Sequence, residues 1–574
     1  MIDECLTKLT IGLPNSSYFP YDTLEAKVAL PERFQPSQNL DDDKLAKKLA
    51  ITCISESKAA HITVPHDAPS SVPLPAKIDL ATALQYGQAT GYPPLLSFLR
   101  QFTRENLHPN VPYLNGPEVI LTCGSTDGFG KTLECLTNVW DPVKDWVSDR
   151  EGVLCEEFAY MNAIQAVLPR GLNIAPVKID EEGMLASGPG GLEDVLGNWD
   201  TRKGKRPHLM YTVTIGQNPT SGTLSVERRK EIYKICQKYD VIIVEDDPYW
   251  YLQFPSAAEH QASIRGSTPP RPAVQNYNLG DGKKSSGFRF LDSLIPSYLS
   301  VDTDGRVVRL DTFSKTVAPG CRLGWITAQP KIIERILRIT ETSTQQPSGF
   351  VQAMIAQTIM GSQHASSTTA FKANKSGEAD GWKVEGWVRW LEGLRGEYER
   401  RMNKMCSALE YHRFTTKQQR FGSSSSFSDE DDEWAIVSKV PMYSFTWPLG
   451  GMFVWVKFHL ESHPLFEHRD ISPQRLSKAL WIHLTRKPYR VLVAPGDMFS
   501  PTEEIQKEEG WKFVRLCFAA IDEAEVGSAG ERFAQACEAF WCLRRKRDIE
   551  EIEGAEVSVQ EVGKAEVLNL GYIC

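Results

Sequence analysis

The sequence predicts an α/β protein whose larger domain contains a mostly parallel β-sheet. Between about residues 77 and 360, short apolar runs alternate with segments of helical periodicity. The runs are apolar at successive positions, which is typical of strands buried on both faces. Small or polar residues follow each run, and ligands of such proteins lie beyond the carboxyl ends of the strands. At 574 residues the chain exceeds the usual size of one domain, so we expect two.

Four runs are expected to be strands of this sheet: residues 119–122, 209–213, 241–244 and 307–310. Residues 225–239 are expected to form a helix, because Ile232, Ile235 and Cys236 share one face and charged residues occupy the other. A second helical segment follows the first strand and runs to Leu136. The order of strands and helices indicates parallel strand pairing.

Three stretches interrupt this pattern. Residues 255–299 are rich in Pro, Gly, Ser and Lys, residues 363–381 in Ser, Thr, Ala and Lys, and residues 415–433 combine a serine run with an acidic run. Such segments bury little apolar surface, so we expect surface insertions or disordered loops. The acidic residues 546–574 are expected to form a loosely held tail.

The overall composition argues against several classes of protein. A formal net charge of −9 disfavours a nucleic-acid partner, because phosphate binding needs a basic face. The 12 cysteines lack the paired spacing of a metal site, so we expect buried free thiols and no metal. Neither a signal peptide nor an apolar run of roughly 18 residues is visible, so we expect a cytoplasmic protein with no membrane partner.

Lys315 is the strongest candidate for a reactive residue. It follows the strand at 307–310, with Thr312 and Ser314 before it and Arg322 seven residues after it. A lysine amine can form a Schiff base with a carbonyl group and later carry a proton. The two hydroxyl groups and the guanidinium can bind a phosphate group. Such a lysine alone is more often an exposed surface residue, so the other motifs decide its meaning.

Two further motifs follow strands. Gly124, Ser125 and Thr126 precede a helical segment whose N-terminal backbone N–H groups can bind an anion, although a plain helix cap is equally compatible. Asp127 must then point away from that anion. Asn218 follows the strand at 209–213 and can donate its amide to a ligand oxygen, although its Pro- and Gly-rich neighbourhood is also typical of a turn.

An acidic motif follows the strand at 241–244. Asp246 can pair with the protonated nitrogen of a ring, and Tyr249 can reach the same ligand oxygen as Asn218. An exposed acidic turn would explain residues 245–247, but it would not explain the Pro-Tyr pair that follows.

In this order, Asn218-Pro219-Thr220, Glu245-Asp246-Asp247-Pro248-Tyr249 and Ser314-Lys315 resemble the motifs of class I and II aminotransferases of the fold-type I group. The segments 211–213, 227–233 and 245–254 are similar to the aromatic amino acid and α-aminoadipate (kynurenine) aminotransferase branch. The resemblance covers about residues 12–520 outside the three inserts. It implies a large cofactor-binding domain over residues 77–360 and a small domain built from both chain ends. Residues 361–545 would form most of the small domain, and residues 1–76 would supply a lid and the rest of it.

The resemblance also implies a cofactor and site residues. Lys315 would hold pyridoxal phosphate, Asp246 its ring nitrogen, and Tyr160 would stack on the ring. Arg515 would bind the substrate α-carboxylate, with Asn218 and Gly12 near it. Tyr86 would reach the phosphate of the neighbouring subunit, which implies a homodimer with shared sites. The whole expected cofactor set is Ser125, Thr126, Tyr160, Asn218, Asp246, Tyr249, Thr312, Ser314, Lys315, Arg322 and Tyr86.

The expected reaction moves an amino group from an aromatic amino acid, 2-aminoadipate or another donor to 2-oxoglutarate or another 2-oxo acid. We expect residues 13–19 and Tyr92 to line the side-chain pocket. The same cofactor supports elimination and cyclisation, so a lyase or an aminocyclopropane-carboxylate-synthase-like enzyme remains the alternative. A regulator with an inactive aminotransferase domain is disfavoured, because residues 1–76 lack a basic helical pair.

Overall fold

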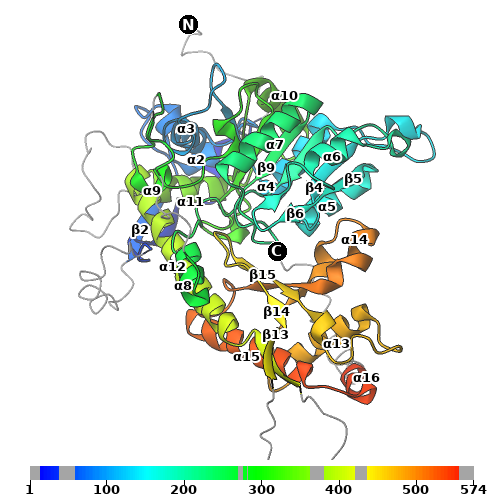
Figure 1. Ribbon diagram of the computed structural model, residues 1–574. Helices are drawn as coiled ribbons and strands as arrows, with labels where there is room; N and C mark the ends of the chain where they lie inside the picture. Colours follow the sequence, from blue (N-terminus) through cyan, green and yellow to red (C-terminus); the bar gives the residue numbers. More distant parts are fainter. Residues whose placement is uncertain are drawn as a thin grey trace, which may run out of the picture.

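The computed structural model describes residues 13–37, 59–268, 276–280, 282–361, 381–419 and 436–554. Its large domain is built on a seven-stranded sheet in the order β3-β11-β10-β9-β8-β4-β5 (Figure 1). These strands are β3 (Glu118–Thr122), β4 (Gly152–Glu156), β5 (Asn173–Val177), β8 (Leu209–Thr212), β9 (Ile242–Asp246), β10 (Val307–Thr312) and β11 (Gly324–Ala328).

The sheet is mostly parallel, as expected. Within it, β11 runs antiparallel to both of its neighbours, and the other neighbouring pairs are parallel. The carboxyl ends of six strands therefore lie along one edge. Every residue of β4, β10 and β11 is buried, as expected of strands covered on both faces, and the buried residues of β10 include the charged Arg309 and Asp311.

Helices cover both faces of this sheet. On one face, Phe129 and Leu133 of α4 (Ser125–Leu136) pack with Val308 and Leu310 of β10. On the other, residues of α7 (Val226–Tyr239) pack with β9, and Ser225 caps this helix as its side chain accepts from the Arg228 backbone N–H. Further helices of this domain are α5 (Met161–Val167), α6 (Leu192–Gly197) and α10 (Pro330–Thr342), and β6 (Ile179–Asp180) pairs with β7 (Gly183–Met184).

The N-terminal strands β1 (Thr23–Ala29) and β2 (Ala59–Pro65) form an antiparallel ribbon of their own. The ribbon lies against the large domain near α11 (Gly349–Ile359), and the indole N–H of Trp382 donates to the Ala29 carbonyl at 3.0 Å. Helices α2 (Leu80–Ala83) and α3 (Pro93–Phe102) follow the ribbon. The small-domain sheet therefore contains no strand from residues 13–37 or 59–76, although the sequence suggested that this segment would contribute to that domain.

The small domain contains a four-stranded sheet in the order β14-β15-β17-β16. Its strands are β14 (Tyr443–Ser444), β15 (Phe453–Phe458), β16 (Ala494–Pro495) and β17 (Phe513–Cys517). The helices around it are α12 (Lys383–Tyr411), α13 (Pro473–Thr485), α14 (Glu503–Glu508) and α15 (Glu523–Trp541). The long helix α12 runs from the large domain along the small one and packs against α15 (Figure 1).

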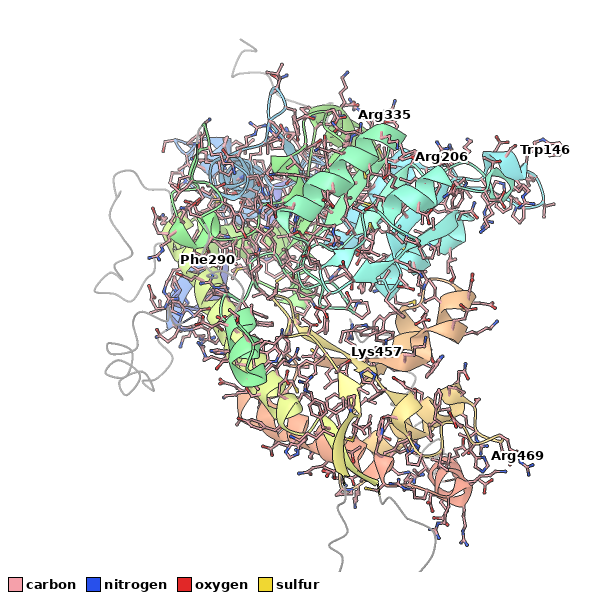
Figure 2. The ribbon with its side chains drawn as sticks, viewed as in Figure 1. Trp146, Arg206, Phe290, Arg335, Lys457 and Arg469 are labelled. Carbon is pink, nitrogen blue, oxygen red and sulfur yellow. The ribbon has the colours of Figure 1, made fainter. Side chains whose placement is uncertain are left out.

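Of the two alternatives expected for residues 255–299, a surface insertion or a disordered loop, the disordered loop was wrong for the residues that the structure describes. They form α8 (Ala257–Arg265) and α9 (Arg289–Asp292), and Phe290 and Leu291 are buried in the core. Phe290 lies beside α12, where the guanidinium of Arg395 sits 4.7 Å from its ring centre (Figure 2). Phe290, Leu291 and Leu294 recur at helical spacing, but the stretch was interpreted by its overall content of Pro, Gly, Ser and Lys, and this short apolar pattern was overlooked.

Two other expectations need correction. Residues 415–419 belong to β12 (Phe414–Gln419), which pairs with β13 (Ile436–Pro441). Residues 546–554 form α16 (Lys546–Gly554), which packs against α13 through the buried Ile549 and Ile552 and is not a loose tail. The insert at 363–381 lies outside the described residues except for Gly381, as do 420–433 and 555–574.

The part of the chain that the structure describes has no membrane-spanning helix and no metal-binding cluster. None of its helices is both long and apolar enough to cross a membrane. Its His, Cys, Asp and Glu side chains form no group of three that could hold a metal ion. Its nine cysteines are free thiols, and Cys155, Cys236, Cys406 and Cys537 are buried.

Candidate active site

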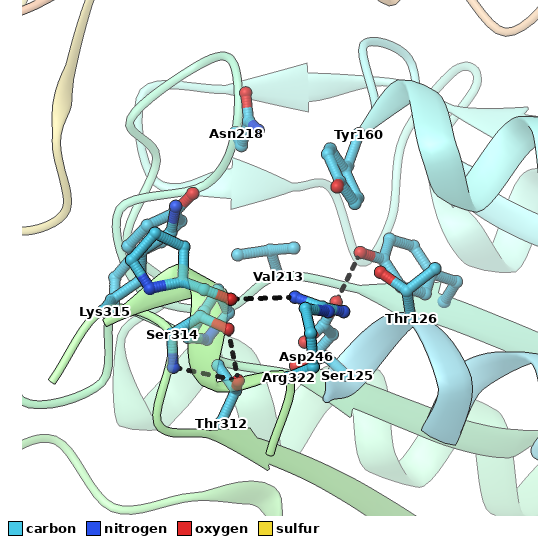
Figure 3. A pocket seen from close by; sticks show the side chains of 14 residues that line it. Ser125, Thr126, Tyr160, Val213, Asn218, Asp246, Thr312, Ser314, Lys315 and Arg322 are labelled. Carbon is cyan, nitrogen blue, oxygen red and sulfur yellow. Dashed lines mark hydrogen bonds between the residues drawn. The ribbon is translucent and has the colours of Figure 1, made fainter. Parts of the chain in front are cut away.

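A pocket opens at the carboxyl edge of the large sheet (Figure 3). Ten residues singled out from the sequence line it together: Ser125, Thr126, Tyr160, Asn218, Asp246, Tyr249, Thr312, Ser314, Lys315 and Arg322. The pocket wall also includes Tyr211, Val213, Pro248 and Pro319.

Asp246 is a buried carboxyl in the wall of this pocket, at the end of β9. The Tyr211 hydroxyl donates to its Oδ2 at 2.8 Å, whereas its Oδ1 is buried without a hydrogen-bond partner among the described residues. Burial, together with the charge of Asp247, raises the pKa of Asp246 to about 7. A ligand that brought a protonated ring nitrogen to Oδ1 would satisfy this atom and stabilise the carboxylate.

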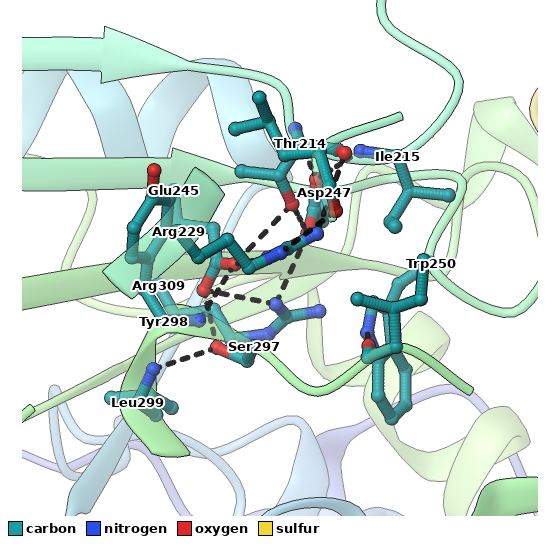
Figure 4. A network of polar contacts seen from close by, with 12 residues as sticks. Thr214, Ile215, Arg229, Glu245, Asp247, Trp250, Ser297, Tyr298, Leu299 and Arg309 are labelled. Atoms are coloured by element: carbon teal, nitrogen blue, oxygen red, sulfur yellow. Dashed lines mark hydrogen bonds and ion pairs between the residues drawn. The ribbon is translucent and has the colours of Figure 1, made fainter. Parts of the chain in front are cut away.

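Glu245 and Asp247, the neighbours of Asp246 in sequence, lie in a different environment (Figure 4). Successive side chains at a strand end point to opposite faces, so Glu245 and Asp247 point away from Asp246. The guanidinium of Arg309 lies 3.1 Å from Glu245 and 3.3 Å from Asp247, and Arg229 lies 2.9 Å from Glu245. Although burial opposes ionisation, these two guanidinium groups lower the pKa of Glu245.

Backbone N–H groups also donate to the two carboxylates of this network. The Thr214 backbone N–H donates to Asp247 Oδ1 at 2.7 Å, and the Tyr298 backbone N–H donates to Glu245 at 3.0 Å. Arg309 also contacts Asp311 at 3.0 Å. Glu245 and Asp247 are thus fully engaged outside the pocket, and Asp246 is the acidic residue of this motif that faces it.

The N-terminus of α4 and Arg322 form another part of the pocket wall. Gly124 has a φ of 100°, and a Cβ there would lie 2.9 Å from the Arg322 Nη2 atom. Glycine therefore lets the guanidinium lie against the helix N-terminus, where Nη2 donates to the Cys123 carbonyl at 3.1 Å. Asp127 accepts from the Cys123 backbone N–H at 2.8 Å and from Lys131 at 2.9 Å, and it does not line the pocket, as expected. Backbone N–H groups and a guanidinium here suit a phosphate.

Lys315 reaches the pocket from a tightly held turn after β10. The Ser314 backbone N–H donates to the Thr312 Oγ1 at 3.1 Å, and the two hydroxyl oxygens lie 2.8 Å apart. Phe313 is buried, with its ring centre 5.2 Å from that of Trp325. Because Phe313 anchors the turn in the core, its neighbours Ser314 and Lys315 are left at the pocket surface.

Arg515, on β17, does not line the pocket itself but contacts Asn218, which does. Its Nη1 donates to the Oδ1 of Asn218, which lines the pocket, at 2.5 Å. Its side chain is buried, with 3% exposed. Arg515 is thus a small-domain cation that contacts a residue of the pocket wall, and such a cation is suited to bind an anionic group of a ligand.

Comparisons with known proteins agree with this arrangement. The family model for aminotransferases of class I and II matches residues 149–380. An aromatic amino acid aminotransferase of Schizosaccharomyces pombe is 32% identical over 531 residues, which cover 92% of this chain and 90% of the relative. The chain belongs to the class I and II aminotransferases. The expectations of family and of an enzyme of aminotransferase type are thereby confirmed.

Other relatives of this aminotransferase carry related names. An L-tyrosine:2-oxoglutarate aminotransferase of Tapinella panuoides is 34% identical over 439 residues, 76% of this chain and 68% of that protein. The crystal structure of aminotransferase Aro8 from Candida albicans superposes with a TM-score of 0.69 at 29% identity and covers 94% of both chains. This likeness confirms the expected fold type.

Some expected site residues of the aminotransferase lie elsewhere. Tyr86 is 67% exposed and does not line the pocket of its own chain. Gly12 lies outside the described residues. Tyr92 is buried, with its hydroxyl 2.9 Å from the Asp79 backbone N–H, so it is a core residue and not a pocket wall. Leu13 and Tyr18 are exposed and also do not line the pocket, so the expected side-chain pocket was wrong for these residues.

Sequence reasoning missed Tyr211, which supports Asp246. Tyr211 precedes the end of β8, next to β9 in the sheet, and its hydroxyl group is the only polar side-chain group within residues 209–211. A hydroxyl in a strand buried on both faces needs a partner. This requirement could have identified the contact, because an acceptor for the Tyr211 hydroxyl was to be expected on an adjacent strand such as β9.

Proposed function

We propose that this aminotransferase uses pyridoxal phosphate to move an amino group from an aromatic amino acid to 2-oxoglutarate. The observation that carries the proposal is that Lys315 and the buried carboxyl of Asp246 line the same pocket. The Oδ1 atom of Asp246 lacks a hydrogen-bond partner among the described residues. The substrate class is supported by the relatives, whose names specify aromatic amino acids and, for two of them, tyrosine and 2-oxoglutarate.

The residues of the pocket fit this cofactor. When bound, pyridoxal phosphate supplies an aldehyde carbon that takes up the amino group and a pyridine ring that accepts the electron pair released at the substrate α-carbon. Asp246 would hold the ring nitrogen protonated, because a buried carboxylate is stabilised by a cation beside it. Asn218 and Tyr249 would donate to the phenolic oxygen, and Tyr160 would contact the ring face.

Two further groups of residues would fix the ligands at their charged ends. Ser125, Thr126, Thr312, Ser314 and Arg322 would hold the phosphate by hydroxyl, backbone and guanidinium donors. Arg515, held by Asn218, would bind the α-carboxylate that every amino and oxo acid substrate carries. The Lys315 Nζ would bind the cofactor covalently between turnovers and would move the α-proton during them.

We further propose a homodimer in which Tyr86 reaches the phosphate of the partner subunit. Tyr86 is 67% exposed, and the side chain of its neighbour Gln85 donates to the Pro14 carbonyl of the N-terminal segment, which carries the exposed Tyr18 and Tyr21. Tyr21 and Phe350 contact each other edge to face, with 5.1 Å between ring centres. Exposed aromatic residues grouped in this way are typical of a protein–protein interface.

The test is a panel of amino donors offered to the cofactor-loaded enzyme with 2-oxoglutarate. We expect phenylalanine, tyrosine or tryptophan to yield glutamate and the matching aromatic 2-oxo acid in equal amounts, without ammonia. Release of ammonia without glutamate would support the lyase alternative. Absence of amino-group transfer from every donor would refute the proposal.

A further inference from the structure

Two phenylalanines enclose the guanidinium of Arg515. Its Cζ lies 4.1 Å from the ring centre of Phe453 and 4.7 Å from that of Phe499. Both rings are buried, at 1% and 3% exposure. The guanidinium lies over the face of each ring, where a cation is attracted by the π electrons, and such a contact takes up no hydrogen-bond acceptor.

The two rings come from different parts of the small domain, and each is tied to the large domain through its backbone. The Ser221 hydroxyl donates to the Phe453 carbonyl at 2.7 Å, and the Ala159 backbone N–H donates to the Phe499 carbonyl at 3.0 Å. Ser221 belongs to the loop that carries Asn218, and Ala159 precedes Tyr160. The rings are thus placed relative to the two loops that line the pocket.

A close approach of the backbones strengthens this connection. Gly216, in the loop before Asn218, has a φ of 54°, and a Cβ there would lie 2.5 Å from the backbone of Gly450 and Gly451. These glycines precede Phe453 on β15. The segment that delivers Phe453 therefore packs directly on the loop that delivers Asn218.

We propose that Phe453 and Phe499 are positioning residues that hold Arg515 by cation–π contacts and so set the affinity for the substrate α-carboxylate. The inference rests on the proposed role of Arg515. The contacts orient the guanidinium so that its in-plane donors meet Asn218 on one side and the carboxylate on the other. Because all substrates share this carboxylate, the two rings affect donors and acceptors alike.

The test replaces each ring by an aliphatic side chain in the cofactor-loaded enzyme. Phe499→Leu is expected to raise KM about 10-fold for both the aromatic donor and 2-oxoglutarate, because a desolvated cation–π contact is worth about that factor. The inhibition constant of 3-phenylpropanoate, which has the carboxylate but no amino group, should rise by the same factor. The kcat value and the visible absorption of the bound cofactor should change little.

The matched control is Phe458→Leu. Phe458 is a buried residue of the same strand as Phe453, but its ring stacks on Phe533, away from Arg515. This control should leave both KM values within about 2-fold. Phe453→Leu provides a second test if Phe499→Leu does not fold, with the same expected rise in KM.

Three results would overturn the inference. Unchanged KM values in both ring variants would show that the rings do not support the clamp. A rise confined to the aromatic donor would make the rings part of a side-chain pocket. An equal rise in Phe458→Leu would reveal a general packing effect. A wild-type enzyme that transfers no amino group would instead refute the proposed function, so the two failures are distinguishable.

Discussion

Asp246, in the candidate active site, is expected to make the stability of the protein depend on pH. Burial raises its pKa to about 7, whereas an aspartate in an unfolded chain has a pKa near ~3.9. The folded protein then holds more protons than the unfolded chain between about pH 4 and 7. Its free energy of unfolding must therefore fall as pH rises through this window, by up to about 4 kcal/mol for one such group. Glu156, whose pKa burial also raises to about 7, contributes with the same sign.

This dependence can be measured by urea unfolding of protein stripped of pyridoxal phosphate at pH 5 and pH 7.5. Asp246→Asn is expected to reduce the loss of stability between the two values, because the neutral amide does not ionise. Asp240→Asn, at an exposed helix end, is the control and should leave the loss unchanged. An identical pH dependence in wild type and Asp246→Asn would contradict the assignment of a raised pKa to this carboxyl.

Arg515 should act on every substrate alike. A lysine cannot reproduce the planar fork that makes two charge-assisted hydrogen bonds to a carboxylate. Arg515→Lys is therefore expected to lower kcat/KM for the aromatic donor and for 2-oxoglutarate, each by about 10- to 1000-fold. Steady-state kinetics with both substrates checks this. An effect on one of the two substrates alone would remove Arg515 as the common carboxylate site.

At the scale of elements, strand β9 separates two electrostatic environments. Asp246 faces the pocket, whereas Glu245 and Asp247 join Arg229 and Arg309 in a buried network. Removing one partner from such a network leaves charges buried and unpaired. Arg309→Met is expected to lower the free energy of unfolding by about 3–5 kcal/mol.

Urea unfolding of Arg309→Met measures this cost directly. Arg338→Met is a matched control, because Arg338 pairs with Glu334 on an exposed helix face and is expected to contribute little. A loss no larger than that of the control would mean that the network is not held together by Arg309.

Helix α16 was expected to be part of a loose tail, and its burial gives a second prediction about elements. Ile549 and Ile552 are 0% and 6% exposed and pack into the core around α13 and α15. Ile549→Ala is expected to destabilise the protein by about 2–5 kcal/mol, because it leaves a cavity. The exposed Glu550→Ala should change stability by less than about 0.5 kcal/mol, as thermal or urea unfolding of both variants would show. Equal stabilities would mean that the helix is dispensable.

The elements differ in how far the sequence predicts them, for physical reasons. Strands β3, β8, β9 and β10 are buried on both faces and carry polar residues at their ends, so both strand and site positions can be inferred. Helix α7 is predictable from one apolar face and a serine cap. Phe290 and Ile549 were not identified as core residues, because their burial depends on packing against the distant helices α12 and α13.

At the scale of the whole molecule, the pocket is assembled from residues that lie far apart in the chain. Ser125, Tyr160, Asn218, Asp246 and Lys315 meet because six parallel strands end at one edge of the sheet. The sequence order of the motifs predicts this meeting. The contact between Arg515 and Asn218 depends on how the small domain packs on the large one, and only the resemblance to the family suggested it.

The central claim is that this pocket holds pyridoxal phosphate on Lys315 for amino-group transfer. Reduction of the loaded enzyme with borohydride, followed by proteolysis and mass spectrometry, tests it most directly, because reduction makes the link to the lysine permanent. The account predicts the reduced cofactor on the peptide that contains Lys315, and no such adduct in Lys315→Ala. An adduct on another lysine, or a Lys315→Ala variant that retains it, would contradict the account.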